Sequence, residues 1–417
     1  MTVEALNVLP GRIHDLFPEQ EVALKEMWAQ VLNVLEGHPF HLVNEVAEPD
    51  ATLEGGAAQE QLAASLNRTF VKPRIRFVSN KTVFRDALGD CSEEDIKNFK
   101  STLRLMFRQD HPDNLMLRFL RARKYDVTKA LESLAFTLRW RQEEFKANEL
   151  LLKGELEVAR TQDKGLLLQF EIGKAFIYGI DRKDRPLVVV KPELHDPKTQ
   201  SDYDMERYVV FIIEAVRGFM KEPMVDTAAV VFDFTNFTLA NLDYAVLKFI
   251  FKCLEAHYPE CLGFLFIHRA PWIFNGVWNI IKHWIDPVVA AKISFTKTYE
   301  DLAEFIEPKY ILKDLGGESD FSYEYVVPAA NENDRTKDFA KKKELLNERD
   351  QILDAFVENT VIWIKSTEHV AREAQAQKDS WADRLRNRYW VLDPYVRGRN
   401  IFDRNGAMAQ FQPDYIP

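Results

Sequence analysis

One short segment, residues 272–285, places the strongest limit on what this 417-residue chain can be. At helical spacing its polar side chains would form a single narrow stripe, made of Asn275, Asn279, Lys282 and His283. A surface helix is ordinarily apolar over a stripe roughly 100° wide, whereas this segment is apolar over most of its circumference. It is too short to span a bilayer, which takes about 20 residues. It must therefore be covered on more than one side, by protein core, by bound lipid or by a membrane surface.

Composition and charge exclude several classes of protein. The net charge of −10 argues against a nucleic acid partner, because no general attraction to phosphate is expected. Three cysteines, Cys91, Cys253 and Cys261, are odd in number and form no C-x-x-C, so we expect free thiols in a reducing compartment and no metal site. The first residues do not read as a signal peptide, and no run of 18 apolar residues exists. These features predict a soluble, cytoplasmic protein.

The periodicity of apolar residues predicts an α/β fold. Strands are expected at residues 166–171, 176–179, 187–190, 228–234 and 262–267. The last three are continuous apolar runs, which are typical of strands buried on both faces of a parallel sheet. Helical segments at 205–220 and 241–257 lie between them and predict right-handed crossovers. A sheet covered by helices on one face, and on the other by the mobile apolar segment 272–285, would leave a deep cavity.

Both flanks of this layer are expected to be mainly helical. Residues 15–36 have helical spacing, and residues 44–66 have the composition of a linker. The stretch 113–145 is rich in helix, with Asp126 as a predicted N-cap. Residues 331–393 contain neither Gly nor Pro and predict a long helix, interrupted near Val361. The tail 394–417 carries three prolines and is expected to be extended.

The chain has none of the common catalytic signatures. It lacks G-x-S-x-G, G-x-x-x-x-G-K-[ST], H-E-x-x-H and G-x-G-x-x-G. We therefore expect a protein that is not an enzyme and that uses no cofactor. A basic group, Arg118, Arg121, Arg123 and Lys124, stands out instead. Arginine binds phosphate with a bidentate fork, although surface arginines paired with nearby acids would read the same way.

Six motifs in order along the chain carry a resemblance to a known family. They are LRFLRARKYD at 117–126, GIDRKDRP at 179–186, VFDF at 231–234, HYPECLG at 257–263, IDPVVAAKI at 285–293 and LGG at 315–317. Together they resemble the CRAL-TRIO lipid-transfer proteins over roughly residues 100 to 320. With its long flanks, the chain looks most like the fungal phosphatidylinositol-transfer branch.

The resemblance implies an all-helical N-terminal subdomain followed by a lipid-binding domain. That domain has a mostly parallel sheet, helices on one face and an apolar gate helix over a cavity for one lipid. The implied division is an N-terminal extension at 1–92, the helical subdomain at 93–150, the lipid-binding domain at 165–320 and a helical C-terminal extension at 321–417. The segment 272–285 matches the gate, whose expected lipid contacts are Phe274, Trp278, Ile281, Trp284 and Ile285.

The resemblance also implies a binding site for a phosphatidylinositol headgroup. Its residues match Arg123, Glu260 and Lys292 of this chain. The chemistry agrees, because Arg and Lys neutralise a phosphodiester while a carboxylate accepts hydrogen bonds from inositol hydroxyls. Relatives that also bind phosphatidylcholine carry two hydroxyls where this chain has Thr238 and Ala240, so we expect poor phosphatidylcholine binding.

The predicted function is thus non-catalytic transfer of a phospholipid, phosphatidylinositol above all, with transient contact to a membrane such as the endoplasmic reticulum or endosomes. Three alternatives remain open. The same fold could carry another hydrophobe, such as a sterol precursor. An enzyme could act on lipid esters, and a scaffold could work through the flanking helices. The sequence predicts no particular protein partner.

Overall fold

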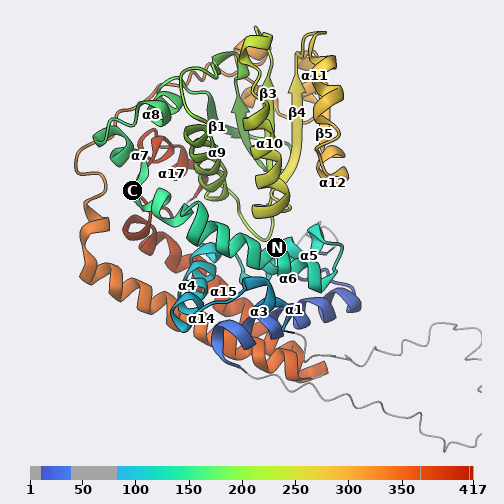
Figure 1. Cartoon of the computed structure of the whole chain (residues 1–417), viewed down its shortest axis with the longest axis vertical. Helices are drawn as coiled ribbons and strands as arrows, with labels where there is room; N and C mark the ends of the chain where they lie inside the picture. Colours follow the sequence, from blue (N-terminus) through green and yellow to red (C-terminus); the bar gives the residue numbers. More distant parts are fainter. Residues whose placement is uncertain (1–10, 39–81, 367, 413, 417) are drawn as a thin grey trace, which may run out of the picture.

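A five-stranded sheet forms the centre of the upper half of the molecule in Figure 1. The computed structural model describes residues 11–38, 82–366, 368–412 and 414–416. The strands are β1 Ala175–Ile180, β2 Pro186–Val190, β3 Ala228–Asp233, β4 Leu262–His268 and β5 Ile293–Thr296, in that order across the sheet. β1 is antiparallel to β2, and β2 to β5 run parallel. The predicted α/β class is confirmed.

Four of the predicted strands are confirmed, and one is wrong. The segments 176–179, 187–190, 228–234 and 262–267 correspond to β1, β2, β3 and β4, with Phe234 just beyond β3. Residues 166–171 belong instead to helix α8, Lys164–Glu171, in which Leu166, Gln169 and Phe170 share one buried face at helical spacing. The sequence did not predict β5, because four residues carry too little periodicity.

Three helices lie over one face of the sheet. They are α9 Asp202–Arg217, α10 Tyr244–Lys252 and α11 Phe274–Ile281, and a short helix, α12 Pro287–Ala290, leads from α11 to β5. On the opposite face Phe264 and Phe266 of β4 pack against Phe305, with ring centroids 5.5 and 5.1 Å apart. The predicted position of the apolar helix, on the face opposite the other helices, is wrong. Right-handed crossovers between parallel strands bring all of these helices to the same side.

A second, wholly helical core lies below the sheet (Figure 1). It is built from α1 Pro18–Glu36, α3 Val83–Leu88, α4 Glu93–Phe107, α5 Pro112–Ala122, α6 Val127–Arg139, α14 Phe339–Lys365 and α15 Glu368–Val396. The helix predicted for 15–36 is confirmed as α1, and Asp126 caps α6 by accepting the backbone N–H of Lys129. The predicted linker at 44–66 lies outside the described residues. The predicted domain boundaries remain predictions.

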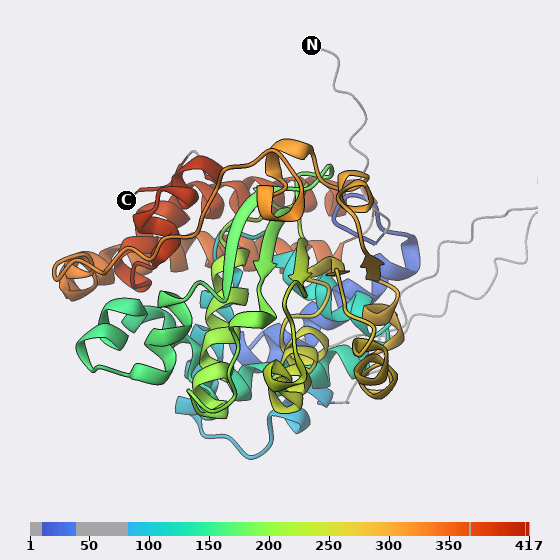
Figure 2. The same cartoon turned by 90° about the horizontal axis from the view of Figure 1, so that it is seen from above.

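The C-terminal segment differs from its prediction in two ways. The long helix breaks at Ser366 and not near Val361. The prediction of an extended tail is also wrong. Helix α15 continues through Pro394, and the helices α16 Ile401–Arg404 and α17 Ala407–Phe411 follow it. Seen from above, this orange-to-red segment runs along one side of the sheet (Figure 2). Phe402 and Met408 are buried in the same core as the sheet, so the C-terminal segment joins both cores.

Candidate functional site

An apolar cavity of about 210 Å³ lies between the sheet and the three helices that cover it. Its wall includes Val230, Phe232, Leu265 and Ile267 from the sheet, Tyr208 and Ile212 from α9, Leu247 and Ile250 from α10, and Phe274, Trp278 and Ile281 from α11. Although α10 is strongly apolar, none of its residues is fully buried. The apolar side of α10 therefore faces the cavity and not a closed core.

Helix α11 closes one side of this cavity. Phe274 and Ile281 are buried against it, and the Phe274 ring lies 4.5 Å from that of Phe234 beyond β3. The helix is shorter than the predicted segment, and Trp284 lies just past its end. There the centroid of its ring lies 5.6 Å from the ring centroid of Tyr244 and 4.6 Å from Lys248 Nζ. Both of these residues are on α10. Helix α11 thus lies over the cavity, and its action as a gate remains a prediction. Trp284 contacts the neighbouring helix.

The outer side of the same region is apolar as well. Trp272 is 85% exposed, and Ile280, Phe295 and Val288 are between 40% and 48% exposed. They lie on or next to α11, α12 and β5, which are grouped at one edge of the sheet in Figure 1. Large exposed apolar groups gathered in one place are typical of a contact surface for protein or membrane. No helix in the described ranges is long and apolar enough to cross a membrane.

Two of the three predicted headgroup residues lie together. Lys292 Nζ donates to Glu260 Oε2 at 3.2 Å, and both side chains keep about a fifth of their surface exposed, 21% and 17%. Glu260 precedes β4 and Lys292 precedes β5, so parallel pairing of these strands brings the two residues to one edge of the sheet. Neighbours of this pair, Cys261 and Ile293, line the cavity. A cation and a carboxylate thus stand at one end of it.

The arginines of the basic group lie in different surroundings. Arg123 is the C-cap residue of α5 and donates to Ser133 Oγ on α6 at 3.3 Å. Arg121 pairs with Asp226 Oδ2 at 3.2 Å, and its burial lowers its pKa. Arg118 is buried and donates to the backbone oxygen of Glu260 at 2.8 Å. Arg118 therefore fixes the position of Glu260, a role that the sequence did not reveal.

Comparisons with known proteins agree with this geometry. Residues 170–317 match the CRAL/TRIO domain, and residues 84–135 match the CRAL/TRIO N-terminal domain. The chain is 37% identical to the phosphatidylinositol transfer protein CSR1 of Eremothecium gossypii, over 96% of this chain and 98% of that protein. The chain belongs to the CRAL-TRIO family. The resemblance seen in the sequence motifs is thereby confirmed.

Other CRAL-TRIO proteins match at various levels. The CRAL-TRIO domain-containing protein C3H8.02 of Schizosaccharomyces pombe is 36% identical over 96% of this chain and 92% of its own length. The crystal structure of Sfh5 aligns with 61% of this chain and 94% of its own, at 14% identity and a TM-score of 0.43. CSR1 and C3H8.02 each align with 96% of this chain, so the family relationship covers the helical extensions too.

The far end of the cavity in this CRAL-TRIO chain carries a polar chain of contacts that the sequence did not predict. Lys174 Nζ donates to His195 Nδ1 at 2.8 Å, and His195 Nε2 donates to Asp243 Oδ2 at 3.2 Å. All three line the otherwise apolar cavity. Burial lowers the pKa of Lys174 to about 8 and also lowers the pKa of His195. A protonated lysine, a neutral imidazole and a carboxylate satisfy this pattern of donors and acceptors at pH 7.

Possible metal ligands and thiols among the described residues also bear on the chemistry of the site. In the part of the chain that the structure describes, no group of three or more His, Cys, Asp or Glu side chains is placed to hold a metal ion. Cys91, Cys253 and Cys261 are free thiols. Burial raises the pKa of Cys261, which favours the neutral thiol form.

Proposed function

We propose that this protein carries one phospholipid, phosphatidylinositol, between membranes without altering it chemically. The observation that carries the proposal is the apolar cavity beneath α11, with the Lys292–Glu260 ion pair at one end. Roughly 30 acyl methylenes left in water would cost about 25 kcal/mol, at about 0.8 kcal/mol for each. A carrier must therefore enclose the chains. The relatives named above, which include a phosphatidylinositol transfer protein, support this choice of ligand.

In this proposal the headgroup inserts between Lys292 and Glu260. Lys292, with Arg123 from α5, neutralises the phosphodiester, and Glu260 accepts hydrogen bonds from inositol hydroxyls. Lys292 and Glu260 partner each other's charges in the structure, so an inserted headgroup has to replace this ion pair. Ala240 offers no hydroxyl, and Thr238 Oγ1 already donates to Asn241 Oδ1 at 2.9 Å, which supports poor binding of phosphatidylcholine.

Lipid exchange requires α11 to move. The cavity of about 210 Å³ lies below the roughly 300–1,000 Å³ of typical ligand pockets, so a two-chain lipid needs more space than this conformation offers. Trp272, Ile280 and Phe295 are exposed beside the gate and would enter the membrane surface when it opens. The protein would then be cytoplasmic and would bind transiently to the surface of an internal membrane such as the endoplasmic reticulum or endosomes.

The proposal is tested with purified protein, donor vesicles containing labelled phosphatidylinositol, and acceptor vesicles, without nucleotide. Wild type should transfer the label, and Lys292→Ala should slow transfer at least tenfold. Removing one member of a largely desolvated charge pair costs about 2–5 kcal/mol. The matched control is Lys309→Ala, which removes an exposed lysine paired with Glu307 at 2.7 Å and should leave the rate unchanged. Unchanged transfer by Lys292→Ala would overturn the headgroup assignment, and no transfer by wild type would overturn the function.

A further inference from the structure

The cavity has a second polar end, formed by Lys174, His195 and Asp243. Backbone contacts place it at the sheet edge opposite the Lys292–Glu260 ion pair. The N–H of Lys191, just after β2, donates to the backbone oxygen of Lys174 at 2.8 Å, so Lys174 lies where β2 ends. Because β2 to β5 are parallel, the C-terminal ends of these strands lie at the same end of the sheet as Lys174. Glu260 and Lys292 lie at the opposite end, where β4 and β5 begin.

The charge of Lys174 is only partly compensated by protein. Its ammonium group contacts a neutral imidazole nitrogen and Met205 Sδ at 3.6 Å, and among the described residues it forms no ion pair with a carboxylate. Asp243, at the far side of the imidazole, is the N-cap of α10. Its Oδ1 accepts the backbone N–H groups of Ala245 and Val246 at 3.0 and 3.2 Å, so the helix N-terminus already stabilises this carboxylate.

An apolar side chain would pack at this position about as well as the buried lysine does. Lys174 is 4% exposed and lines a cavity whose other walls are almost entirely apolar. An ammonium group has three donors, and two are used by His195 and Met205. Asp243 and Asp196 compensate the positive charge from a distance, without forming an ion pair with Lys174. The third donor and the remaining positive charge are therefore available to a ligand oxygen inside the cavity. A ligand that satisfies both is apolar along its length and anionic at one end.

We propose that the cavity also binds an unesterified long-chain carboxylate, with its carboxylate on Lys174 and its chain extending toward α11. This inference rests on the proposed lipid-carrying function but reverses the orientation, since the phospholipid headgroup would occupy the opposite end. The volume of about 210 Å³ suits one chain better than two. His195 holds the ammonium in place through its bond to Nζ, and Asp243 fixes the imidazole that accepts it.

The test is equilibrium binding of oleate and of oleyl alcohol, which share a chain and differ in charge, to the full-length protein. Wild type should bind oleate at least tenfold more tightly than oleyl alcohol. Lys174→Met, which keeps the length of the side chain, should weaken oleate at least tenfold and leave the alcohol within about threefold. Lys309→Met, on the exposed surface, is the matched control and should bind both as wild type does.

Several outcomes would overturn the inference. Equal affinity of wild type for the acid and the alcohol would do so without any variant, even if Lys174→Met failed to fold. Unchanged oleate affinity in Lys174→Met would do so as well, and so would loss of oleate binding in Lys309→Met. Oleate binding and phosphatidylinositol transfer are measured on the same wild-type sample. Transfer without oleate binding overturns this inference alone, whereas oleate binding without transfer overturns only the proposed function.

Discussion

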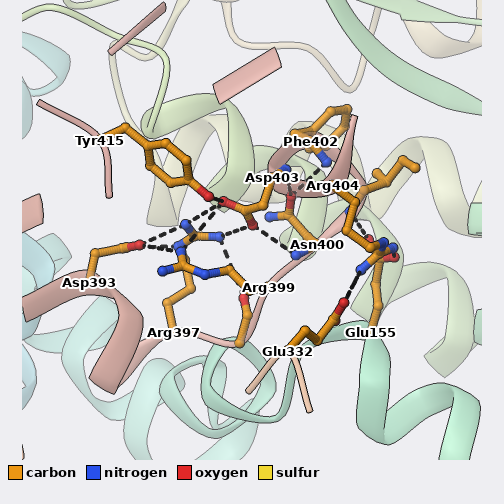
Figure 3. Close-up of polar contacts among 12 residues, drawn as sticks. Glu155, Glu332, Asp393, Arg397, Arg399, Asn400, Phe402, Asp403, Arg404 and Tyr415 are labelled. Atoms are coloured by element: carbon orange, nitrogen blue, oxygen red, sulfur yellow. Dashed lines mark hydrogen bonds and ion pairs between the residues drawn. The ribbon is translucent and has the colours of Figure 1, made fainter. Parts of the chain in front are cut away.

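Two regions of the molecule are held together by opposite kinds of contact. The first, which we call the C-terminal latch, consists of Asp393, Arg397, Arg399, Asp403 and Arg404 with Glu155 and Glu332 (Figure 3). Its charges are buried and paired: Arg397 bonds both Asp393 and Asp403 at 2.7–2.8 Å, and Arg399 bonds Asp393 at 2.8 Å. Arg404 bridges Glu155 and Glu332, which come from distant parts of the chain.

Backbone contacts tighten the latch further. The N–H of Gly398 donates to the oxygen of Leu151 at 2.7 Å, and that of Ile401 donates to Glu155 Oε1 at 2.9 Å. Gly154 has φ +59°, and a Cβ there would lie 2.9 Å from the Cα of Gly398, so a larger residue cannot fit. These contacts attach the C-terminal segment to α7, Ala147–Arg160, at one defined position.

The second region is the proposed gate, residues 272–285. Among the described residues, the side chains of α11 form no hydrogen bond or ion pair with another element, and its contacts with the rest of the chain are apolar. A charge-assisted hydrogen bond requires a particular partner at a particular distance. An apolar contact can be replaced by a contact with another apolar surface at little cost in free energy. The latch therefore suits a rigid frame, and the gate suits a part that exchanges protein contacts for lipid.

The largest effect is expected from breaking the latch. Asp393→Ala leaves Arg397 and Arg399 buried without their shared carboxylate, and removing one partner of a buried pair destabilises by about 3–5 kcal/mol. Chemical denaturation should report this loss. The matched control is Asp383→Ala on the same helix, which breaks an exposed pair with Arg386 and should cost less than about 1 kcal/mol. Equal stabilities of the two variants would show that the latch is not a rigid element.

A second buried charge cluster predicts how the frame responds to acid. Burial alone would raise the pKa of Glu214, but Arg141, Arg217 and Arg108 outweigh it and lower the pKa from 4.5 to about 2. The folded carboxylate thus contributes stability that is fully present above pH 4.5 and is lost as the pH falls toward 2. At about 1.4 kcal/mol for each pKa unit, the loss is about 3 kcal/mol.

Denaturation curves from pH 5 to pH 2 measure this contribution. Glu214→Gln should be less stable at pH 5, because the arginines lose their counter-charge, and its stability should fall less steeply with acid than that of wild type. A wild-type slope retained by Glu214→Gln would assign the acid sensitivity to other groups.

The gate is tested by comparing its two sides. Ile281 is buried against the cavity, whereas the neighbouring Ile280 is 48% exposed on the outer side. Ile281→Asp should lower the amount of co-purifying lipid and slow transfer at least tenfold, because a carboxylate then faces the apolar chains. Ile280→Asp should retain lipid but bind vesicles more weakly, since it removes an exposed apolar group. Both variants should remain folded, with Ile281→Asp the less stable because its carboxylate is buried. Identical behaviour of the two would contradict the assignment of the two sides.

The sequence predicted the apolar helix over the cavity much better than the latch, for a physical reason. Apolar periodicity is local, so residues 272–285 could be recognised without knowledge of their surroundings. The latch depends on Arg404 meeting Glu155, 249 positions away, and prolines such as Pro394 wrongly favoured an extended tail. Likewise Lys174 and Asp243 come from segments with no shared spacing, and only the parallel sheet brings them to one end of the cavity.

The smallest effect is expected from stiffening the gate without changing its surface. Gly276 lies within α11, and a Cβ at this position would meet no atom within 4 Å, so Gly276→Ala adds no clash. Alanine favours a helix by roughly 1 kcal/mol over glycine. If opening of the gate requires α11 to lose part of its helical structure, transfer should slow about fivefold, while global unfolding stays nearly unchanged. Hydrogen exchange of residues 274–281 should become slower, and vesicles should accelerate it less than in wild type. Faster or equal transfer, together with stronger protection, would mean that α11 moves as a rigid helix, so that the opening occurs in the loops on either side of it.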